Sequence, residues 1–249
     1  MAHPKLRERW TGARSLPFRQ ALRAMLAPME RWAILLLAPA EADPDVWNRR
    51  LLDLACDLAA AVGVEDLVAH LRDQEARSLG ETTAAGPASY QAFVEIGGDA
   101  RARAAVSALG EVGEAHVYRV ERRRVKAYPR MWPDGTRTPG VEMVSAMRRL
   151  PALSRAEFDA HWRDRHVPLA RLHHPGMWEY RQNAVQEILT PGSPDFDGIA
   201  VVGFPTAFDC QTRLYDSPEG EALIFEDLAR FLDLGRSEAT FTGEYVLRS

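Results

Sequence analysis

The chain has 249 residues, of which 46% are hydrophobic and 27% charged, enough for one large or two ordinary domains. A formal net charge of −4 argues against a general nucleic-acid binder, which is usually basic. The longest apolar run is too short for a membrane span, and the N-terminal residues lack the apolar core of a secretory signal. The only two cysteines, Cys56 and Cys210, predict thiols in a reducing compartment. We therefore expect a cytoplasmic protein with no nucleic-acid and no membrane partner.

Residues 1–29 form a basic amphipathic segment in which six Lys and Arg side chains stand against a single acid, Glu8. Such a segment can dock on an acidic partner or a membrane surface, or it can cover the outside of a domain. We interpret it as an N-terminal arm or helix.

Residues 30–128 have the pattern of a first α+β domain. The apolar run 31–39 predicts a buried strand. Asp43 followed by Pro44 is typical of a helix start, and the apolar spacing that follows ends at Gly63. Further strands are expected at 64–77, 90–96 and 116–127, and a short helix at 99–109. The order is βαββαβ.

Residues 129–140 contain three prolines and two glycines and indicate a linker. The same order of elements then repeats over residues 141–249. We expect strands at 141–150, 177–189, 198–204 and 239–247, and helices at 155–172 and 217–234.

An offset of 111 residues superposes the two predicted helix starts, Asp43 on Ser154. Under this offset Trp47 matches Phe158, Leu51 matches Trp162, and Ala55 matches His166. The first half thus keeps apolar residues and lacks the imidazole. We predict an α+β fold of two tandem ferredoxin-like βαββαβ halves, packed within one chain as a pseudo-dimer of the dimeric α/β-barrel type, with one site in the C-terminal half.

The helix at 155–172 carries the most informative pattern. Ser154 and Glu157 form a capping box, and Phe158, Trp162 and His166 then recur along one face. Pro168 predicts a kink or irregular turn after His166. The imidazole has two interpretations: a buried neutral histidine, or an acid or base whose pKa is tuned by an apolar pocket.

The motifs S-R-A-E-F-D-A-H-W-R-D-R-H-V-P-L, W-E-Y-R-Q-N, F-D-G-I-A, D-S-P-E-G-E-A-L and E-D-L-A-R-F-L-D occur in this order after a short strand. Together they resemble the EthD family, a branch of the dimeric α/β-barrel, ferredoxin-like superfamily. The resemblance covers residues 141–249. It aligns the family's Phe, Trp and His with Phe158, Trp162 and His166, its Tyr and Asn with Tyr180 and Asn183, and its Asp-Gly with Asp197 and Gly198.

The resemblance implies a cavity between sheet and helices in which His166, Tyr180 and Asp197 are the candidate catalytic residues. Asp197 either orients His166 or forms a turn. Tyr180 and Asn183 are three apart on one strand and should face opposite sides unless a bulge intervenes. The candidate substrate-binding residues are Phe158, His161, Trp162 and Asn183, and Trp162 can equally belong to the core.

Four histidines fall at positions 161, 166, 173 and 174, but we predict no metal site. His161 and His166 are five apart, about 140° around an α-helix, so they should not meet at one ion without distortion. Dinucleotide, P-loop and nucleophile-elbow motifs are absent from the sequence.

The first hypothesis is a cofactor-independent acid–base enzyme, a lyase, cyclase or isomerase, that acts on an aromatic or phenolic compound in aromatic degradation. The second is a haem protein, because relatives in the superfamily bind haem through a histidine. The third is a non-catalytic small-molecule-binding accessory protein. The sequence leaves open whether two chains form a homodimer.

Overall fold

A computed structural model describes residues 29–80 and 86–249 of the chain. The arm expected for residues 1–29 therefore lies outside the described residues, apart from Met29. Of the helices within these ranges, none is long and apolar enough to cross a membrane.

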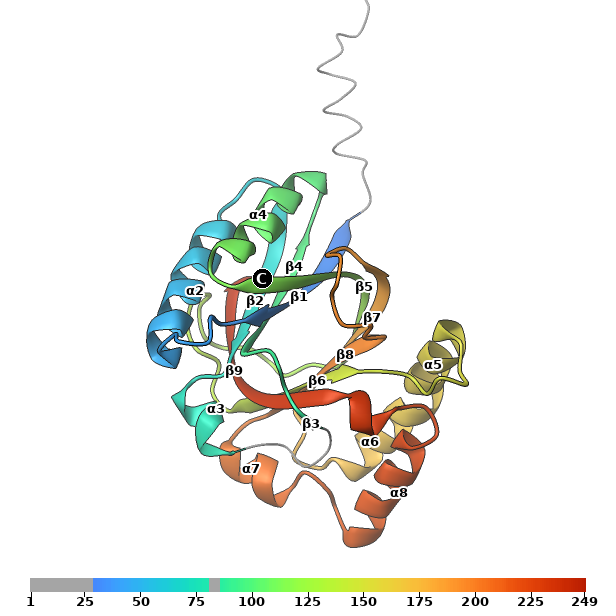
Figure 1. Ribbon diagram of the computed structural model, residues 1–249. Helices are drawn as coiled ribbons and strands as arrows, with labels where there is room; N and C mark the ends of the chain where they lie inside the picture. The colour runs from blue at the N-terminus through green and yellow to red at the C-terminus, as the bar shows by residue number, and fades with distance from the viewer. Residues whose placement is uncertain (1–28, 81–85) are drawn as a thin grey trace, which may run out of the picture.

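Eight antiparallel strands close into a barrel within the described residues (Figure 1). Their order is β2-β4-β1-β5-β7-β8-β6-β9, and β9 pairs back onto β2. The first half supplies one run of four strands and the second half the other, so the intrachain barrel is confirmed. The strands are β1 (Glu30–Leu37), β2 (Val64–Leu71), β4 (Ala92–Gly98), β5 (Glu114–Lys126), β6 (Val141–Met147), β7 (Glu179–Ile188), β8 (Gly198–Phe204) and β9 (Glu238–Arg248); β3 (Gly86–Pro87) adds a short parallel pairing to β9.

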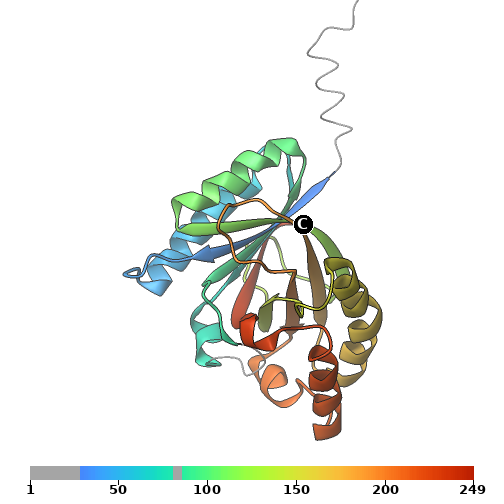
Figure 2. The same ribbon diagram turned by 45° about the vertical axis from the view of Figure 1, so that its right-hand side comes forward.

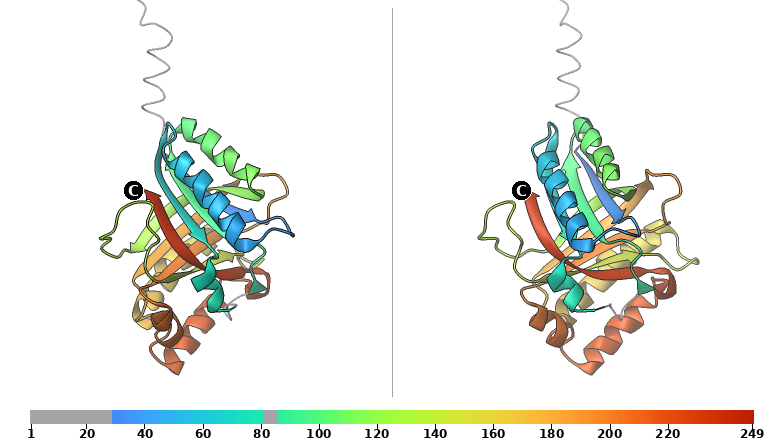
Figure 3. Two further views of the ribbon diagram at one scale, coloured as in Figure 1. Left: turned by 90° about the vertical axis from the view of Figure 1, so that its left-hand side faces the viewer. Right: turned by 60° about the vertical axis from the view of Figure 1, so that its left-hand side comes forward.

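Helices cover the outside of the barrel in two groups, one for each half (Figures 2 and 3). Helices of the first half are α2 (Pro44–Ala59), α3 (Gln74–Ser78) and α4 (Arg103–Ala108), the last flanked by 3₁₀ turns η1 (Ala100–Ala102) and η2 (Leu109–Glu111). The second half has α5 (Arg155–His161), the π-helical turn η3 (Trp162–His166), α6 (Val167–His173), α7 (Ala207–Thr212), α8 (Pro218–Leu228) and the 3₁₀ turn η4 (Leu234–Arg236).

Both predicted helix starts are confirmed. The Asp43 side chain accepts from the first backbone N–H groups of α2, and Ser154 and Glu157 form the reciprocal capping box of α5. Under the 111-residue offset, the positions of α2 that correspond to the aromatic residues and the histidine of α5 and η3 are Trp47, Leu51 and Ala55. All three are buried against the sheet. The first half therefore uses this face for packing alone.

Two predicted elements differ from the structure. The strand expected at 64–77 ends at Leu71, because Asp73 caps the separate helix α3. The linker at 129–140 does more than connect the halves. Arg137 pairs with Asp73, and Thr138 donates to Glu244 of β9, so the segment is held against one mouth of the barrel.

Alternation along the strands separates the outer face from the barrel interior. Ile34 and Leu36 of β1 point outward under α2, whereas Ala33 and Leu35 point into the barrel. One end of the interior is filled by apolar and aromatic side chains such as Tyr118. The other end holds charged and amide side chains with little or no exposure: His70, Glu95, Glu142, Glu179, Arg181, Asn183 and Glu244.

Candidate functional site

The helix that carries His166 is interrupted by one π-helical turn. The N–H of Val167 donates to the carbonyl of Trp162, five residues back instead of four. Pro168 follows directly and has no N–H to continue the α-helical ladder, which favours the wider turn. The predicted irregularity is confirmed, although it begins at Trp162, before the imidazole.

The π turn brings His161 and His166 to the same carboxylate. Asp227 of α8 binds His161 Nε2 through Oδ1 and His166 Nδ1 through Oδ2, both at 2.9 Å. Histidines five apart were expected to meet only if the α-helix is distorted, and the π turn supplies that distortion. Burial opposes ionisation of Asp227, but hydrogen bonds from both imidazoles outweigh it and lower the pKa of this carboxyl.

His166 points its other nitrogen toward a small cavity between the sheet and the helices. The cavity has a volume of about 70 Å³, and its lining includes Trp162, Tyr180 and Tyr215. His166 is 7% exposed, and the part of the chain that the structure describes provides no hydrogen-bond partner for Nε2. The geometry leaves this nitrogen available to a ligand.

Tyr180 adds a hydroxyl to the same cavity. Its oxygen accepts hydrogen bonds from Trp162 Nε1 at 2.8 Å and Gln182 Nε2 at 3.2 Å. Because both contacts use the oxygen as acceptor, its own proton is left to donate. Burial raises the pKa of Tyr180 to about 12, so the hydroxyl stays protonated at neutral pH.

The remaining predicted residues are placed in different surroundings. Phe158 is fully buried in the core beside Trp162, and His161 stacks on Phe231 without lining the cavity. Asn183 faces the barrel interior, where its amide donates to Glu95 Oε1 at 2.7 Å, on the opposite face of β7 from Tyr180. The expected separation of these two side chains thus occurs.

Asp197 does not orient His166. Its carboxylate accepts from the backbone N–H of Arg149 at 2.9 Å and pairs with the guanidinium groups of Arg149 and Arg155. The carboxylate on the imidazole is Asp227, which sequence reasoning missed. A signal was present, because Asp227 stands three residues after Ile224 and four before Phe231, on the apolar stripe of its helix.

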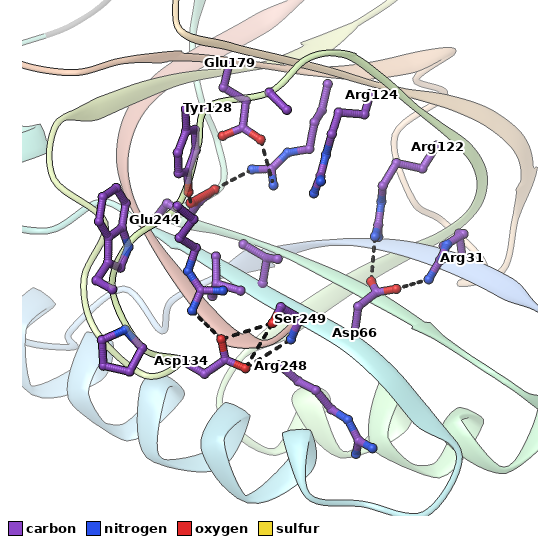
Figure 4. Close-up of a pocket in the computed structure, with 17 residues that line it drawn as sticks. Arg31, Asp66, Arg122, Arg124, Tyr128, Asp134, Glu179, Glu244, Arg248 and Ser249 are labelled. Atoms are coloured by element: carbon purple, nitrogen blue, oxygen red, sulfur yellow. Dashed lines mark hydrogen bonds and ion pairs between the residues drawn. The ribbon is translucent and has the colours of Figure 1, made fainter.

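A second, larger cavity opens at the charged end of the barrel (Figure 4). This space, which we call the barrel-mouth chamber, has a volume of about 810 Å³ and is lined by residues of both halves and of the 129–140 segment. Arg181 lies at its inner end and is surrounded by four glutamates, Glu95, Glu142, Glu179 and Glu244, at 2.9–3.4 Å.

Three buried side chains at this end of the barrel, His70, Glu142 and Glu244, lie close enough to share a metal ion. A guanidinium already takes that place. Arg181 Nη2 is 2.9 Å from Glu244 Oε2, 3.2 Å from Glu142 Oε1 and 3.5 Å from His70 Nε2. The donor set is therefore satisfied by an internal cation and does not fit an additional metal ion.

The protonation states follow from this crowding. Burial disfavours the His70 cation, yet Glu142 and Glu95 raise the pKa of His70 to about 9. Burial also disfavours ionised Glu244, but Arg181 and His70 lower its pKa to about 2. Burial is the largest effect on Glu179 and raises its pKa. Arg181 lowers this pKa, the nearby glutamates raise it, and the net result is a pKa of about 8. At neutral pH Glu179 is therefore mostly neutral.

Comparison with known proteins finds a family model that matches part of the C-terminal half. The EthD domain model matches residues 150–235, which contain His166, Tyr180 and Asp227, so the resemblance seen in the motifs is confirmed for this segment. No curated protein matches the chain.

Solved structures share the fold at low identity. An anthrone oxidase-like protein aligns with a TM-score of 0.57 and 9% identity over 89% of this chain and 94% of its own. A chlorite dismutase variant from Candidatus Nitrospira defluvii aligns with a TM-score of 0.46 and 9% identity, over 92% of this chain and 96% of its own. DtpA from Streptomyces lividans aligns with a TM-score of 0.46 and 13% identity, over 89% of this chain and 92% of its own. The likeness to the first of these supports the barrel architecture alone.

Proposed function

Starting from the EthD domain at residues 150–235, we propose that the chain is an enzyme that moves a proton on a hydrophobic, aromatic small molecule, with His166 as acid and base. The observation that carries the proposal is the pair of nitrogens on His166. Nδ1 is held by the ionised Asp227, while Nε2 faces a mostly apolar cavity without a protein partner.

The residues supply a redox-neutral reaction. His166 Nε2 accepts a proton from a substrate C–H or O–H that an adjacent carbonyl makes acidic, and Asp227 stabilises the imidazolium that forms. The Tyr180 hydroxyl donates a hydrogen bond to the oxygen on which negative charge develops. Return of the same proton to another carbon gives isomerisation. Attack of the carbanion on a second carbonyl carbon of the same molecule, with the proton delivered to the new alkoxide, gives cyclisation, and departure of a leaving group that takes the proton gives elimination.

The size of the cavity limits what reaches the imidazole. About 70 Å³ is less than the roughly 150 Å³ of an engineered cavity that binds benzene. We infer that one edge of a ring enters, with the rest of the substrate outside Tyr215 and Leu234, which are only half buried. The His166–Asp227 pair would suit haem as a donor set, but haem would need room for its whole macrocycle beside the imidazole, and small-molecule sites take roughly 300 Å³ or more. The cavity does not fit haem.

The test is conversion of a panel of phenolic ketones, anthrone among them, in heavy water without added cofactor, followed by mass spectrometry. We expect the wild type to convert at least one compound with uptake of deuterium. We expect His166→Asn to lose about 100-fold or more in rate, and Tyr180→Phe about 100-fold. His116→Asn is the matched control. His116 is also 7% exposed, but it lies away from this cavity and forms a hydrogen bond with Ser193.

The outcomes separate the competing functions. Equal rates for the wild type and His166→Asn would contradict the assignment of the imidazole. Conversion in air but not under argon would show an oxidation in place of a redox-neutral reaction. If no compound reacts, but phenol shifts the NMR signals of the His166 ring in the wild type, the chain is a binding protein.

A further inference from the structure

The barrel-mouth chamber is separate from the cavity at His166. Tyr180 and Arg181 are neighbours on β7, and alternation sends the first outward under the helices and the second into the barrel. An inference about the chamber therefore does not rest on the proposed reaction.

Three of the four carboxyl groups that line the chamber are already paired within the protein. Asp66 pairs with Arg31 and, at 2.7 Å, with Arg122, while Asp134 pairs with Arg130. Glu244 accepts from Arg181 and also from Tyr128 and Thr138. Because Asp66, Asp134 and Glu244 each have a cationic partner in the protein, none of these three carboxylates requires a cationic ligand.

Arginines at the mouth are less fully paired. Six arginines and four acidic side chains line the chamber, although the whole chain carries a net charge of −4. Arg124 is exposed and has no ion pair with any residue in the ranges 29–80 and 86–249. Among the residues that the structure describes, Arg248 donates to the carbonyl of Ala59 alone, and Arg122 Nη2 is buried without a hydrogen-bond partner. The unsatisfied charge at this end of the barrel is positive.

An aromatic wall faces these arginines. Figure 4 shows Arg122 and Arg124 on one side of the chamber and Tyr128 on the other. Tyr128 stacks on Trp132, with ring centroids 5.6 Å apart, and on Trp178 at 4.4 Å, so three aromatic rings pack together here. Glu179 lines the same space, is 3% exposed, and has an Oε2 atom with no partner.

We propose that the barrel-mouth chamber is a second ligand site, for a small aromatic molecule that carries a carboxylate or phosphate group. The oxyanion binds the guanidinium of Arg124, which can offer two N–H groups to a carboxylate or phosphate, and the neighbouring Arg122 adds positive charge on the same side. The ring lies against Tyr128 and Trp132, and Glu179 meets a polar group at the inner end. A volume of about 810 Å³ lies within the roughly 300–1,000 Å³ of small-molecule sites.

Calorimetric titration of the full chain at pH 7 and low salt tests the site with four probes: benzoate, phthalate, phenyl phosphate and inorganic phosphate. We expect phthalate or phenyl phosphate to bind with a Kd below about 1 mM, and Arg124→Gln to weaken binding about tenfold or more. Arg230→Gln makes the same change at an exposed arginine outside the chamber and should leave the affinity unchanged.

The comparison of probes and variants decides each part of the proposal. Inorganic phosphate binding as tightly as phenyl phosphate would refute the aromatic wall. An equal loss in Arg124→Gln and Arg230→Gln would show general charge attraction and overturn the site, as would no binding by any probe. His166→Asn should bind the probes like the wild type, so failure of the proposed reaction and failure of this site are distinguishable.

Discussion

Replacement of Glu179 by Gln tests the electrostatics of the barrel interior most directly. Glu179 shares the Arg181 guanidinium with Glu95, Glu142 and Glu244. Its Oε1 lies 3.4 Å from Arg181 Nη1, and its Oε2 has no partner. Gln has nearly the same shape, keeps one acceptor oxygen and stays neutral at every pH, so the substitution removes the ionisation and replaces the other oxygen by an NH2 donor.

The size and sign of the effect follow from the raised pKa. A rise from 4.5 in the unfolded chain to about 8 in the folded chain corresponds to about 5 kcal/mol, at about 1.4 kcal/mol per pH unit. Between these values the folded state holds a proton that the unfolded state has lost. The contribution is therefore fully present below pH 4.5 and is lost as the pH rises to about 8. Glu179→Gln lacks this loss.

Urea unfolding of both proteins at pH 5, 6, 7 and 8 measures the difference. As the pH rises, we expect the free energy of unfolding of Glu179→Gln to increase relative to that of the wild type by about 1 kcal/mol per pH unit. Titration of groups remote from Glu179 is common to both proteins and cancels. Parallel pH curves would refute the reasoning, and Glu65→Gln, the same change at an exposed strand position, should give such parallel curves.

Three further substitutions test the packing and hydrogen bonds of the two halves. Gly198→Ala should cost about 1–3 kcal/mol in urea unfolding, because its Cβ would lie 2.6 Å from Trp162 Cζ3, whereas Gly110→Ala, with no atom within 4 Å of the added Cβ, should be nearly neutral. Asp227→Ala should cost about 2–3 kcal/mol in the same measurement by leaving two imidazoles without their shared carboxylate; no change would contradict the observed hydrogen bonds. Asp43→Ala removes the cap of α2 and should lower stability by about 1 kcal/mol, and a neutral result would show that the cap is dispensable.

The order of elements and the helix bearing His166 could be predicted because their signals are local. A capping box acts within four residues, and an apolar period of three to four shows which face of a helix is buried. The partner of His166 could not be predicted in this way. Asp227 is 61 positions away, and only the packing of α8 against the π turn brings its carboxylate to the ring.

The charged interior of the barrel could not be predicted from local patterns either. Glu95 lies between Val94 and Ile96, and an acid between two apolar residues reads as the solvent face of a strand. Closure of the sheet through the β5–β7 and β2–β9 pairings turned that face inward, where it met Arg181 from the other half. Two βαββαβ halves and the helix bearing His166 could be predicted from local patterns, since caps and periodicity are properties of neighbouring residues. The carboxylate that holds His166 and the charged lining of the chamber depend on packing between distant segments, because strand alternation is the same whether a polar face meets water or a closed barrel.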